Sequence, residues 1–176
     1  MFMDIRDFTP FSEGREPSEI IQYQNDVFGF MIDIISTHKG IVNQFMGDGF
    51  LAMFGAPVSS GNDSQHAVDA SLEILKELDR RCTSGELIQT RVGIGLHTGD
   101  IVTGNVGTEE RKQYSITGNT VILASRIEQL NKEFKSELLI SKEVFDELEN
   151  SYPNSQSLGP VELKGRSEPT EIIRLV

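Results

Sequence analysis

Cysteine is almost missing from this sequence. Cys82 is the one cysteine among 176 residues, which excludes an internal disulfide and a cysteine-rich zinc site and favours a reducing compartment. Long apolar runs are also missing, since none approaches the roughly 18 residues of a membrane span. The opening Met1-Phe2-Met3 lacks the charged start and long apolar core of a signal peptide. We therefore expect a cytoplasmic domain without membrane contact, whose full-length protein can still carry an upstream anchor.

Positive charge is scarce. The chain has 16 lysines and arginines against 27 aspartates and glutamates, which gives a formal net charge of -11. This balance opposes binding to DNA, RNA or an anionic bilayer surface. A phosphate ligand must then be held by metal ions and by a few well-placed bases.

Apolar residues, in contrast, are sufficient for one core. A hydrophobic content of 38% and ten phenylalanines in 176 residues suit a single domain over residues 1–176. Strands average about 5–6 residues, yet three residues precede Asp4, the acid that follows the first apolar run. We therefore expect the chain to be a fragment of a longer protein.

The most informative stretch runs from Val42 to Gly55, where two apolar runs flank Gly47-Asp48-Gly49. This pattern predicts a tight hairpin whose turn carries a carboxylate, although aspartate and glycine are also ordinary turn residues. Asp4 adds a second carboxylate at the end of another apolar run. Acids at the ends of neighbouring strands can hold two divalent cations roughly 3.5–4 Å apart, an arrangement that clamps a phosphoryl group during in-line displacement.

Helical spacing of apolar residues predicts a long amphipathic helix from Pro17 to a glycine stop at Gly40. We expect Asp63 to cap a second helix, whose charged face from Glu73 to Arg81 is solvated. A glycine turn and a third helix follow a short strand in residues 113–130, and Ser141 caps a short helix.

Period-two alternation predicts strands elsewhere. Residues 91–97 alternate, and Thr98-Gly99-Asp100 predicts a turn that pairs them with residues 101–106 in a hairpin. Gly93 and Gly95 lie inside a strand, where glycine marks the close approach of another backbone or of a ligand. His97 has no second ligand at metal-binding spacing, so we interpret it as a structural histidine. Closing strands are expected around residues 161–164 and 171–176.

Five stretches resemble, in chain order, the class III adenylate and guanylate cyclase catalytic domain. Each is weak alone, but together they cover nearly the whole chain. A diguanylate cyclase domain shares the fold, but its turn carries a second acid where this chain has Gly49. The resemblance implies an α+β fold with a ferredoxin-like βαββαβ core, additional C-terminal strands and a short helix. The stretches are Phe2-Met3-Asp4-Ile5 with Phe8-Thr9, Phe45-Met46-Gly47-Asp48, Val92-Gly93-Ile94 with His97-Thr98-Gly99, Gly118-Asn119-Thr120-Val121 with Ala124-Ser125-Arg126, and Leu163-Lys164-Gly165.

The resemblance also implies a head-to-tail homodimer with sites at the interface. Asp4, Asp48 and the backbone carbonyl of Ile5 would hold two Mg²⁺ or Mn²⁺ ions. One ion would lower the pKa of the ribose 3′-hydroxyl of a nucleoside triphosphate so that it attacks the α-phosphate, and both would offset charge as pyrophosphate leaves. Arg126 of the other subunit would meet the charge that develops on the α-phosphate, and Lys164 would help to hold the terminal phosphates.

Three positions depart from the family pattern. Gln44 stands where adenylate cyclases carry a purine-reading lysine, Ser115 stands where its partner is an aspartate or threonine, and Ile122 replaces a ribose-orienting asparagine. A glutamine amide both donates and accepts, so it can face adenine or guanine. Guanylate cyclases of the family prefer glutamate at the position of Gln44. Because this chain has no acid there, the sequence favours ATP, with GTP as the alternative substrate.

A second class of function is a degenerate domain that binds nucleotide, or merely dimerises, and regulates a partner. The two metal acids Asp4 and Asp48 and the catalytic Arg126 are all present. These are the groups whose loss would be expected in such a domain, so the sequence favours an active adenylate cyclase.

Overall fold

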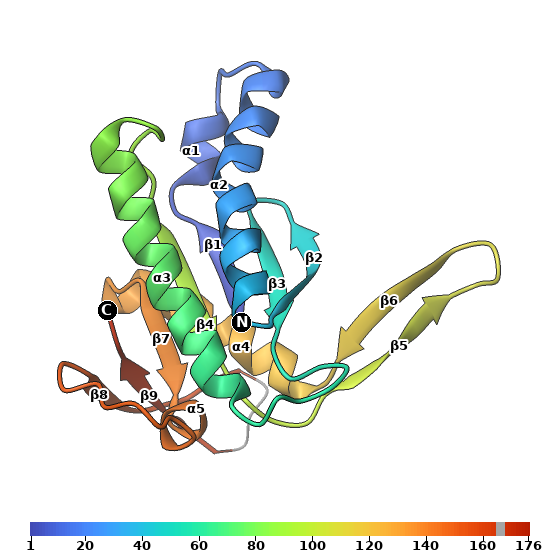
Figure 1. The fold of residues 1–176 in the computed structure, drawn as a ribbon, viewed down its shortest axis with the longest axis vertical. Helices are drawn as coiled ribbons and strands as arrows, with labels where there is room; N and C mark the ends of the chain where they lie inside the picture. Colours follow the sequence, from blue (N-terminus) through green and yellow to red (C-terminus); the bar gives the residue numbers. More distant parts are fainter. Residues whose placement is uncertain (165–167) are drawn as a thin grey trace.

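A mixed β-sheet forms the frame of the computed structural model, which describes residues 1–164 and 168–176 (Figure 1). Within that part of the chain, seven strands form one sheet in the order β2-β3-β1-β4-β7-β9-β8. The pair β4 and β7 is parallel, and the other neighbouring pairs are antiparallel. The strands are β1 (Phe2–Ile5), β2 (Ile41–Met46), β3 (Gly49–Met53), β4 (Val92–Leu96), β7 (Leu138–Ser141), β8 (Gln156–Val161) and β9 (Thr170–Arg174).

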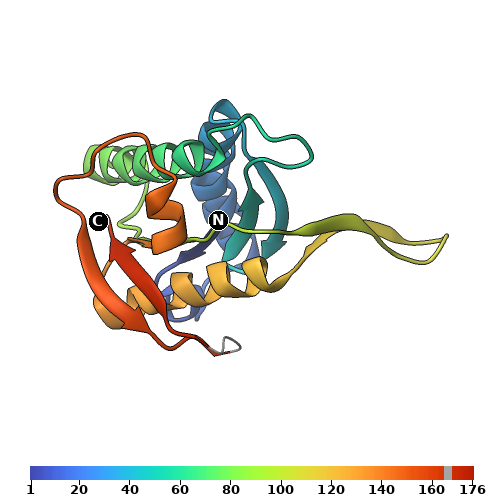
Figure 2. The same cartoon turned by 90° about the horizontal axis from the view of Figure 1, so that it is seen from below.

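Helices cover both faces of this sheet. The long helices α2 (Pro17–Thr37) and α3 (Asp63–Ser84) lie on one face, and α4 (Asn119–Phe134) lies on the opposite face (Figure 2). Short helices α1 (Phe8–Ser12) and α5 (Lys142–Asp146) follow β1 and β7. The chain order β1-α2-β2-β3-α3-β4, with β1 between β3 and β4, is the predicted ferredoxin-like βαββαβ core.

The two helix layers enclose separate apolar cores. Residues of α2 and α3, including Val27, Met31 and Ile74, are fully buried against the sheet. On the other face, Ile127 of α4 packs in a smaller cluster with Leu163. The helical spacing of apolar residues therefore did predict the buried faces of these helices.

One predicted strand pairing is wrong. Residues 91–97 were expected to form a hairpin with residues 101–106, but β4 pairs with β1 and β7 in the central sheet. Strand β5 (Val102–Gly107) instead pairs with β6 (Lys112–Thr117) in a two-stranded sheet that projects from the body (Figure 1). All five residues of β4 are buried, because they sit in the middle of the large sheet, whereas most of β5 is exposed. We call residues 102–117 the arm.

Two boundaries also differ from expectation. Asp63 is the first residue of α3 rather than its cap, and its carboxylate accepts a hydrogen bond of 3.1 Å from the backbone N–H of Ser60. The strand expected around residues 161–164 ends at Val161, and buried Leu163 belongs to the core beneath α4. Gly165, part of the last family-like stretch, lies outside the described residues. The Ser141 side chain caps α5 as predicted, by accepting from the backbone N–H of Val144.

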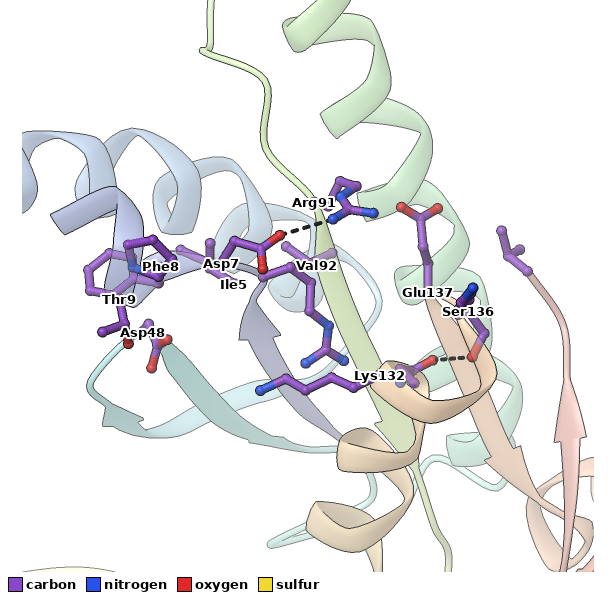
Figure 3. A pocket seen from close by; sticks show the side chains of 15 residues that line it. Ile5, Asp7, Phe8, Thr9, Asp48, Arg91, Val92, Lys132, Ser136 and Glu137 are labelled. Atoms are coloured by element: carbon purple, nitrogen blue, oxygen red, sulfur yellow. Dashed lines mark hydrogen bonds and ion pairs between the residues drawn. The ribbon is translucent and has the colours of Figure 1, made fainter. Parts of the chain in front are cut away.

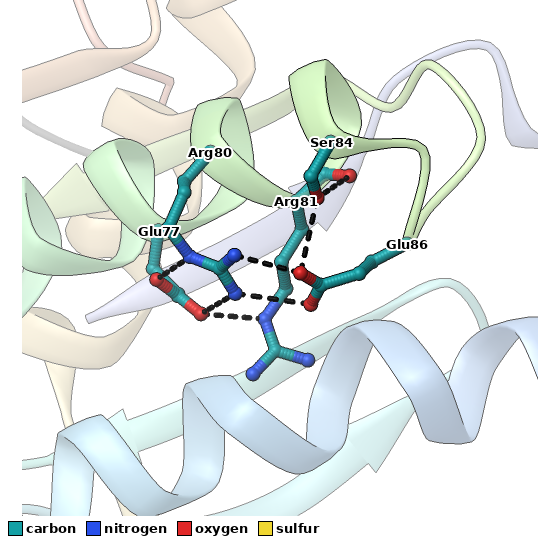
Figure 4. Close-up of polar contacts among 5 residues, drawn as sticks. All are labelled: Glu77, Arg80, Arg81, Ser84 and Glu86. Atoms are coloured by element: carbon teal, nitrogen blue, oxygen red, sulfur yellow. Dashed lines mark hydrogen bonds and ion pairs between the residues drawn. The ribbon is translucent and has the colours of Figure 1, made fainter.

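The charged face of α3 forms a surface network (Figure 4). Arg80 bridges Glu77 and Glu86 at 2.8 and 2.7 Å, and hydrogen bonds from Arg80 and Arg81 lower the pKa of Glu77 to about 2. Exposed ion pairs of this kind contribute little to stability, in keeping with the expected solvated face. Over residues 1–164 and 168–176, no helix has the length and apolar character needed to cross a bilayer.

Candidate active site

The turn between β2 and β3 presents Asp48. Gly47 adopts a left-handed backbone with φ of 64°, a conformation that glycine adopts without strain. Gly49 faces β1 so closely that a Cβ there would lie 2.2 Å from the carbonyl oxygen of Met3. The side chain of Gln24 on α2 donates a 2.8 Å hydrogen bond to the carbonyl of Gly47. The turn therefore requires Gly47, and the contact with β1 requires Gly49.

Strand pairing brings Asp4 to this turn. Asp4 is the direct partner of Gly49 in the antiparallel pair of β1 and β3, and the backbone N–H of Ile5 donates a 2.9 Å hydrogen bond to the carbonyl of Asp48. Burial raises the pKa of Asp4, and the nearby negative charge of Asp48 raises it further. The two predicted acids thus lie together at neighbouring strand ends.

The donor atoms at this junction suit hard divalent cations. Two carboxylates and the main-chain carbonyl of Ile5 offer oxygen, which Mg²⁺ and Mn²⁺ prefer over nitrogen or sulfur. Among the described residues, no group of three or more acidic, histidine or cysteine side chains gathers at one point. Water and substrate oxygens would therefore have to complete the coordination, as is usual for Mg²⁺.

A pocket of about 850 Å³ opens beside these acids and is lined by Asp48, by Phe8 and Thr9 at the start of α1, and by basic side chains (Figure 3). Arg91 lies on its wall and pairs with Asp7 at 2.9 Å. Lys132 reaches into the pocket from α4, with its Nζ atom 3.8 Å from Oδ2 of Asp4. Acids that can hold cations thus face bases that can hold phosphate oxygens.

Sequence reasoning missed these basic residues. Arg91 directly precedes β4, and Lys132 lies on α4 beyond the family-like residues 118–126. A surface arginine or lysine is common in any soluble protein, so neither residue stood out locally. Only the crossing of β1, β4 and α4 places them beside Asp4 and Asp48.

Arg126 lies elsewhere on the same chain. It is half-buried on α4, and its Nη1 atom donates to Oε1 of Gln129 at 3.2 Å. In the part of the chain that the structure describes, Arg126 pairs with neither Asp4 nor Asp48, and it does not line their pocket. One chain therefore does not assemble all the predicted catalytic residues.

The expected base-reading residues lie on strands that touch. Gln44 is exposed on β2 and Ser115 is half-buried on β6. Their chain neighbours are joined, because Asn43 donates a 3.5 Å hydrogen bond to the carbonyl of Tyr114. Ile122 is 52% exposed on α4, and Lys164 is exposed directly before the residues that the structure leaves undescribed.

The strand glycines and His97 have structural surroundings. A Cβ on Gly95 would lie 2.2 Å from the backbone nitrogen of Glu128, so this glycine allows α4 to approach β4, as predicted. At Gly93 the close neighbour is the Arg6 side chain, rather than a backbone or a ligand. His97 Nδ1 lies 2.8 Å from the Ser141 hydroxyl, in line with a structural role.

A ferredoxin-like core with paired acids at adjoining strand ends, beside a basic pocket, defines a catalytic domain of the nucleotide cyclase class. The chain belongs to the adenylate and guanylate cyclase catalytic domain family, whose sequence profile matches residues 1–173. The resemblance noted in the sequence is therefore confirmed.

Two of the curated relatives carry adenylate cyclase names. The chain is 36% identical over 180 residues to adenylate cyclase 1 of Rhizobium meliloti, a match that covers 100% of this chain and 27% of that protein. It is 32% identical to the terminal-differentiation specific adenylate cyclase of Dictyostelium discoideum, over 99% of this chain and 8% of that one. The chain thus spans less than a third of these relatives.

Solved structures confirm the fold. The adenylyl cyclase CyaB from P. aeruginosa superposes with a TM-score of 0.87 at 29% identity, covering 99% of this chain and 91% of that one. The guanylyl cyclase Cya2 superposes with a TM-score of 0.83 at 34% identity, over 98% of this chain and 88% of that one. The two neighbours are named for different substrates, so similarity alone leaves the base open.

Proposed function

We propose that this domain converts ATP to 3′,5′-cyclic AMP and pyrophosphate. The observation that carries the proposal is the pairing of Asp4 with Asp48 at one strand junction, beside a pocket lined by Arg91 and Lys132. In the reaction the ribose 3′-oxygen forms a bond to the α-phosphorus, the bond from that phosphorus to the bridging oxygen of the β-phosphate breaks, and the hydroxyl proton is released.

Each residue has a defined task in this scheme. Asp4, Asp48 and the Ile5 carbonyl would hold two divalent cations, which when bound supply activation of the 3′-hydroxyl and neutralise phosphate charge. The Arg126 guanidinium of a second subunit would stabilise the charge that develops on the α-phosphate. Lys164 would hold the terminal phosphates.

We further propose that the site forms between two copies of the chain in a head-to-tail homodimer. Arg126 lies outside the pocket that Asp48 lines in its own chain, so a second copy is needed to supply it. Apolar side chains are exposed on β2 and the arm, where Phe45 is 55%, Val102 67% and Val106 63% exposed. Exposed apolar groups gathered on adjoining strands are typical of a protein interface. Residues 1–176 act as one catalytic domain in this proposal.

The choice of ATP over GTP depends on Gln44. Its exposed amide on β2 is free to meet a base, and no acid stands there to pair with the N1 and N2 donors of guanine. Two of the curated relatives are named as adenylate cyclases, which favours ATP as well. GTP is the second candidate, because one similar structure is a guanylyl cyclase. A degenerate, regulatory domain is the third, since Ile122 cannot hydrogen-bond the ribose.

Turnover of single nucleotides tests the proposal. The purified domain is incubated with ATP, GTP, CTP or UTP and Mn²⁺, and products are separated by chromatography. We expect cyclic AMP and pyrophosphate in equal amounts, with cyclic GMP as the lesser product and no product from Asp48→Ala. Absence of every cyclic product from a folded, dimeric, Mn²⁺-loaded protein would support the regulatory alternative instead.

A further inference from the structure

Arg6 is enclosed between β1, β4 and α4, next to the proposed metal site. Its side chain is 10% exposed, and its backbone N–H donates a 2.8 Å hydrogen bond to the carbonyl of Arg91. Gly93 on β4 makes room for it, since a Cβ there would lie 1.5 Å from Nη2 of Arg6. The absence of a side chain at Gly93 therefore leaves space for this guanidinium.

The guanidinium joins a proposed metal ligand to helix α4. Its Nη1 atom donates to Oδ2 of Asp4 at 3.3 Å. Its Nη2 atom lies 2.6 Å from Oε1 of Glu128 and donates to the Glu128 carbonyl at 3.2 Å. The Glu128 side chain is 8% exposed, so the pair of Arg6 and Glu128 is nearly removed from solvent.

A buried cation beside a metal ligand creates an electrostatic conflict. Unopposed, Arg6 would attract the Asp4 carboxylate and repel the dications that Asp4 is proposed to bind. Glu128 lies closer to Arg6 than Asp4 does, at 2.6 Å against 3.3 Å. The arginine charge is thus offset first by Glu128, while one hydrogen bond remains to fix Oδ2 of Asp4. Lys132, the second cation near Asp4, is 65% exposed on its side chain and is screened by water.

We propose that Arg6 and Glu128 are positioning residues for the metal site: Arg6 fixes the Asp4 carboxylate, and Glu128 offsets the Arg6 charge so that Asp4 can bind a divalent cation. This proposal concerns metal binding, and it rests on the proposed cyclase function only in assuming that the bound metal serves catalysis. Replacing a residue that hydrogen-bonds to a metal ligand typically lowers metal affinity by 10- to 100-fold.

The test measures binding of Mn²⁺ alone to the dimeric protein, followed through the paramagnetic resonance signal of the free ion. Glu128→Gln should weaken Mn²⁺ binding about tenfold or more, because the released Arg6 then pairs fully with Asp4. Glu133→Gln removes the same charge from an exposed position on α4 and should leave binding unchanged. Asp48→Ala is the reference variant, because the Mn²⁺ binding that it loses relative to wild type is the binding at this site.

The double variant Arg6→Gln with Glu128→Gln separates charge balance from a general structural effect. It restores the local net charge, so Mn²⁺ binding should rise above that of the single Glu128→Gln variant, but it lacks the Arg6 hydrogen bond to Asp4, so binding should stay below wild type. Melting temperatures of all variants establish that each is folded. Should Glu128→Gln fail to fold, the folded double variant still decides, because it must bind Mn²⁺ more weakly than wild type and more tightly than Asp48→Ala.

Two results would overturn the inference. One is equal Mn²⁺ binding by wild type and Glu128→Gln, and the other is a folded double variant that binds no better than Glu128→Gln. Because the measurement needs no nucleotide, an inactive wild type that binds Mn²⁺ in a Glu128-dependent way would refute the proposed cyclase reaction and leave this inference standing.

Discussion

At the scale of single residues, Asp4 is the position where opposing charges meet. Burial and the charge of Asp48 raise the pKa of Asp4, whereas Arg6 and Lys132 act in the opposite direction. Two carboxylates held together are under repulsion that a shared dication relieves. The geometry therefore favours an acid pair built for cations over a structural ion pair.

The first prediction concerns these acids. Asp48→Ala should lower kcat by roughly 100-fold or more. Losing a direct metal ligand should reduce activity at least as much as losing a residue that only hydrogen-bonds to a ligand. The same change relieves repulsion of Asp4, so the free energy of unfolding should stay level or rise slightly. Asp4→Ala should lower kcat by a comparable factor or more. Near-normal product formation by either folded variant would refute the metal assignment.

The second prediction concerns the base. If Gln44 on β2 reads the purine edge, Gln44→Lys should favour ATP, because an ammonium only donates and suits the adenine N1 acceptor. Gln44→Glu should favour GTP, whose N1 and N2 donate. An unpaired buried polar group costs about 1–3 kcal/mol, which corresponds to ATP:GTP ratios shifted by roughly 5- to 150-fold in opposite directions.

The measurement for this second prediction is kcat/KM for both nucleotides at one Mn²⁺ concentration. Gln24→Lys is a matched control, because Gln24 contacts the Gly47 carbonyl near the same turn and is not expected to meet the base. Ratios that stay unchanged in both Gln44 variants would remove Gln44 from the base site.

The local sequence predicted some residues of this site but not others. Asp48 could be found because Gly47 and Gly49 mark its turn in the local sequence. The role of Glu128 could not be predicted, although its spacing from Ala124 and Asn131 places a charge on the buried side of α4. Its partner Arg6 is 122 residues away in the chain, and no local pattern reports such a contact.

At the scale of elements, α4 was predicted well and the pairing of β4 was not. The apolar spacing of α4 is a property of adjacent turns and is therefore visible in sequence. The turn-like Thr98-Gly99-Asp100 after β4 suggested a local hairpin, but pairing depends on which strands are free. Strand β1 and the distant β7 occupy both edges of β4, so β5 continues into the arm.

The close contact of α4 with β4 gives a third prediction. In Gly95→Ala the new Cβ would lie 2.2 Å from a backbone nitrogen and 2.6 Å from the Cα atom of Glu128. The helix would have to move, at a cost of about 3 kcal/mol in free energy of unfolding. Gly104→Ala is the control, because Gly104 lies in the arm with nothing within 4 Å of its Cβ position. Denaturant unfolding should separate the two, and equal stability would contradict the close packing.

At the scale of the whole molecule, the arm is a part that one chain supports only near its base, where Ile116 is buried against Leu51 and Met53. It projects from the body in both views (Figures 1 and 2), and its Val102 and Val106 are 67% and 63% exposed. A two-stranded ribbon is marginally stable alone. A second copy that covers the arm would stabilise it and would supply Arg126 to the pocket lined by Asp48.

The fourth prediction tests this role of the arm. Val106→Asp should raise the dimer dissociation constant about tenfold or more, because a charge would be buried at the interface. Activity per subunit should fall at low protein concentration and recover as the concentration rises. Ile88→Asp adds the same charge at a residue that is 50% exposed outside the arm and β2, and sedimentation should show no change for it. A fully dimeric, fully active Val106→Asp protein would argue against an arm-mediated dimer.

In the proposed dimer, each active site is shared between two chains, with Asp48 on one and Arg126 on the other. The most direct measurement is turnover after mixing Asp48→Ala protein with Arg126→Ala protein, each inactive alone. A heterodimer contains one site with both defects and one intact site. With random exchange of equal amounts, half the dimers are mixed, so we predict roughly a quarter of wild-type activity. No recovery in a sample shown to contain heterodimers would contradict the shared site.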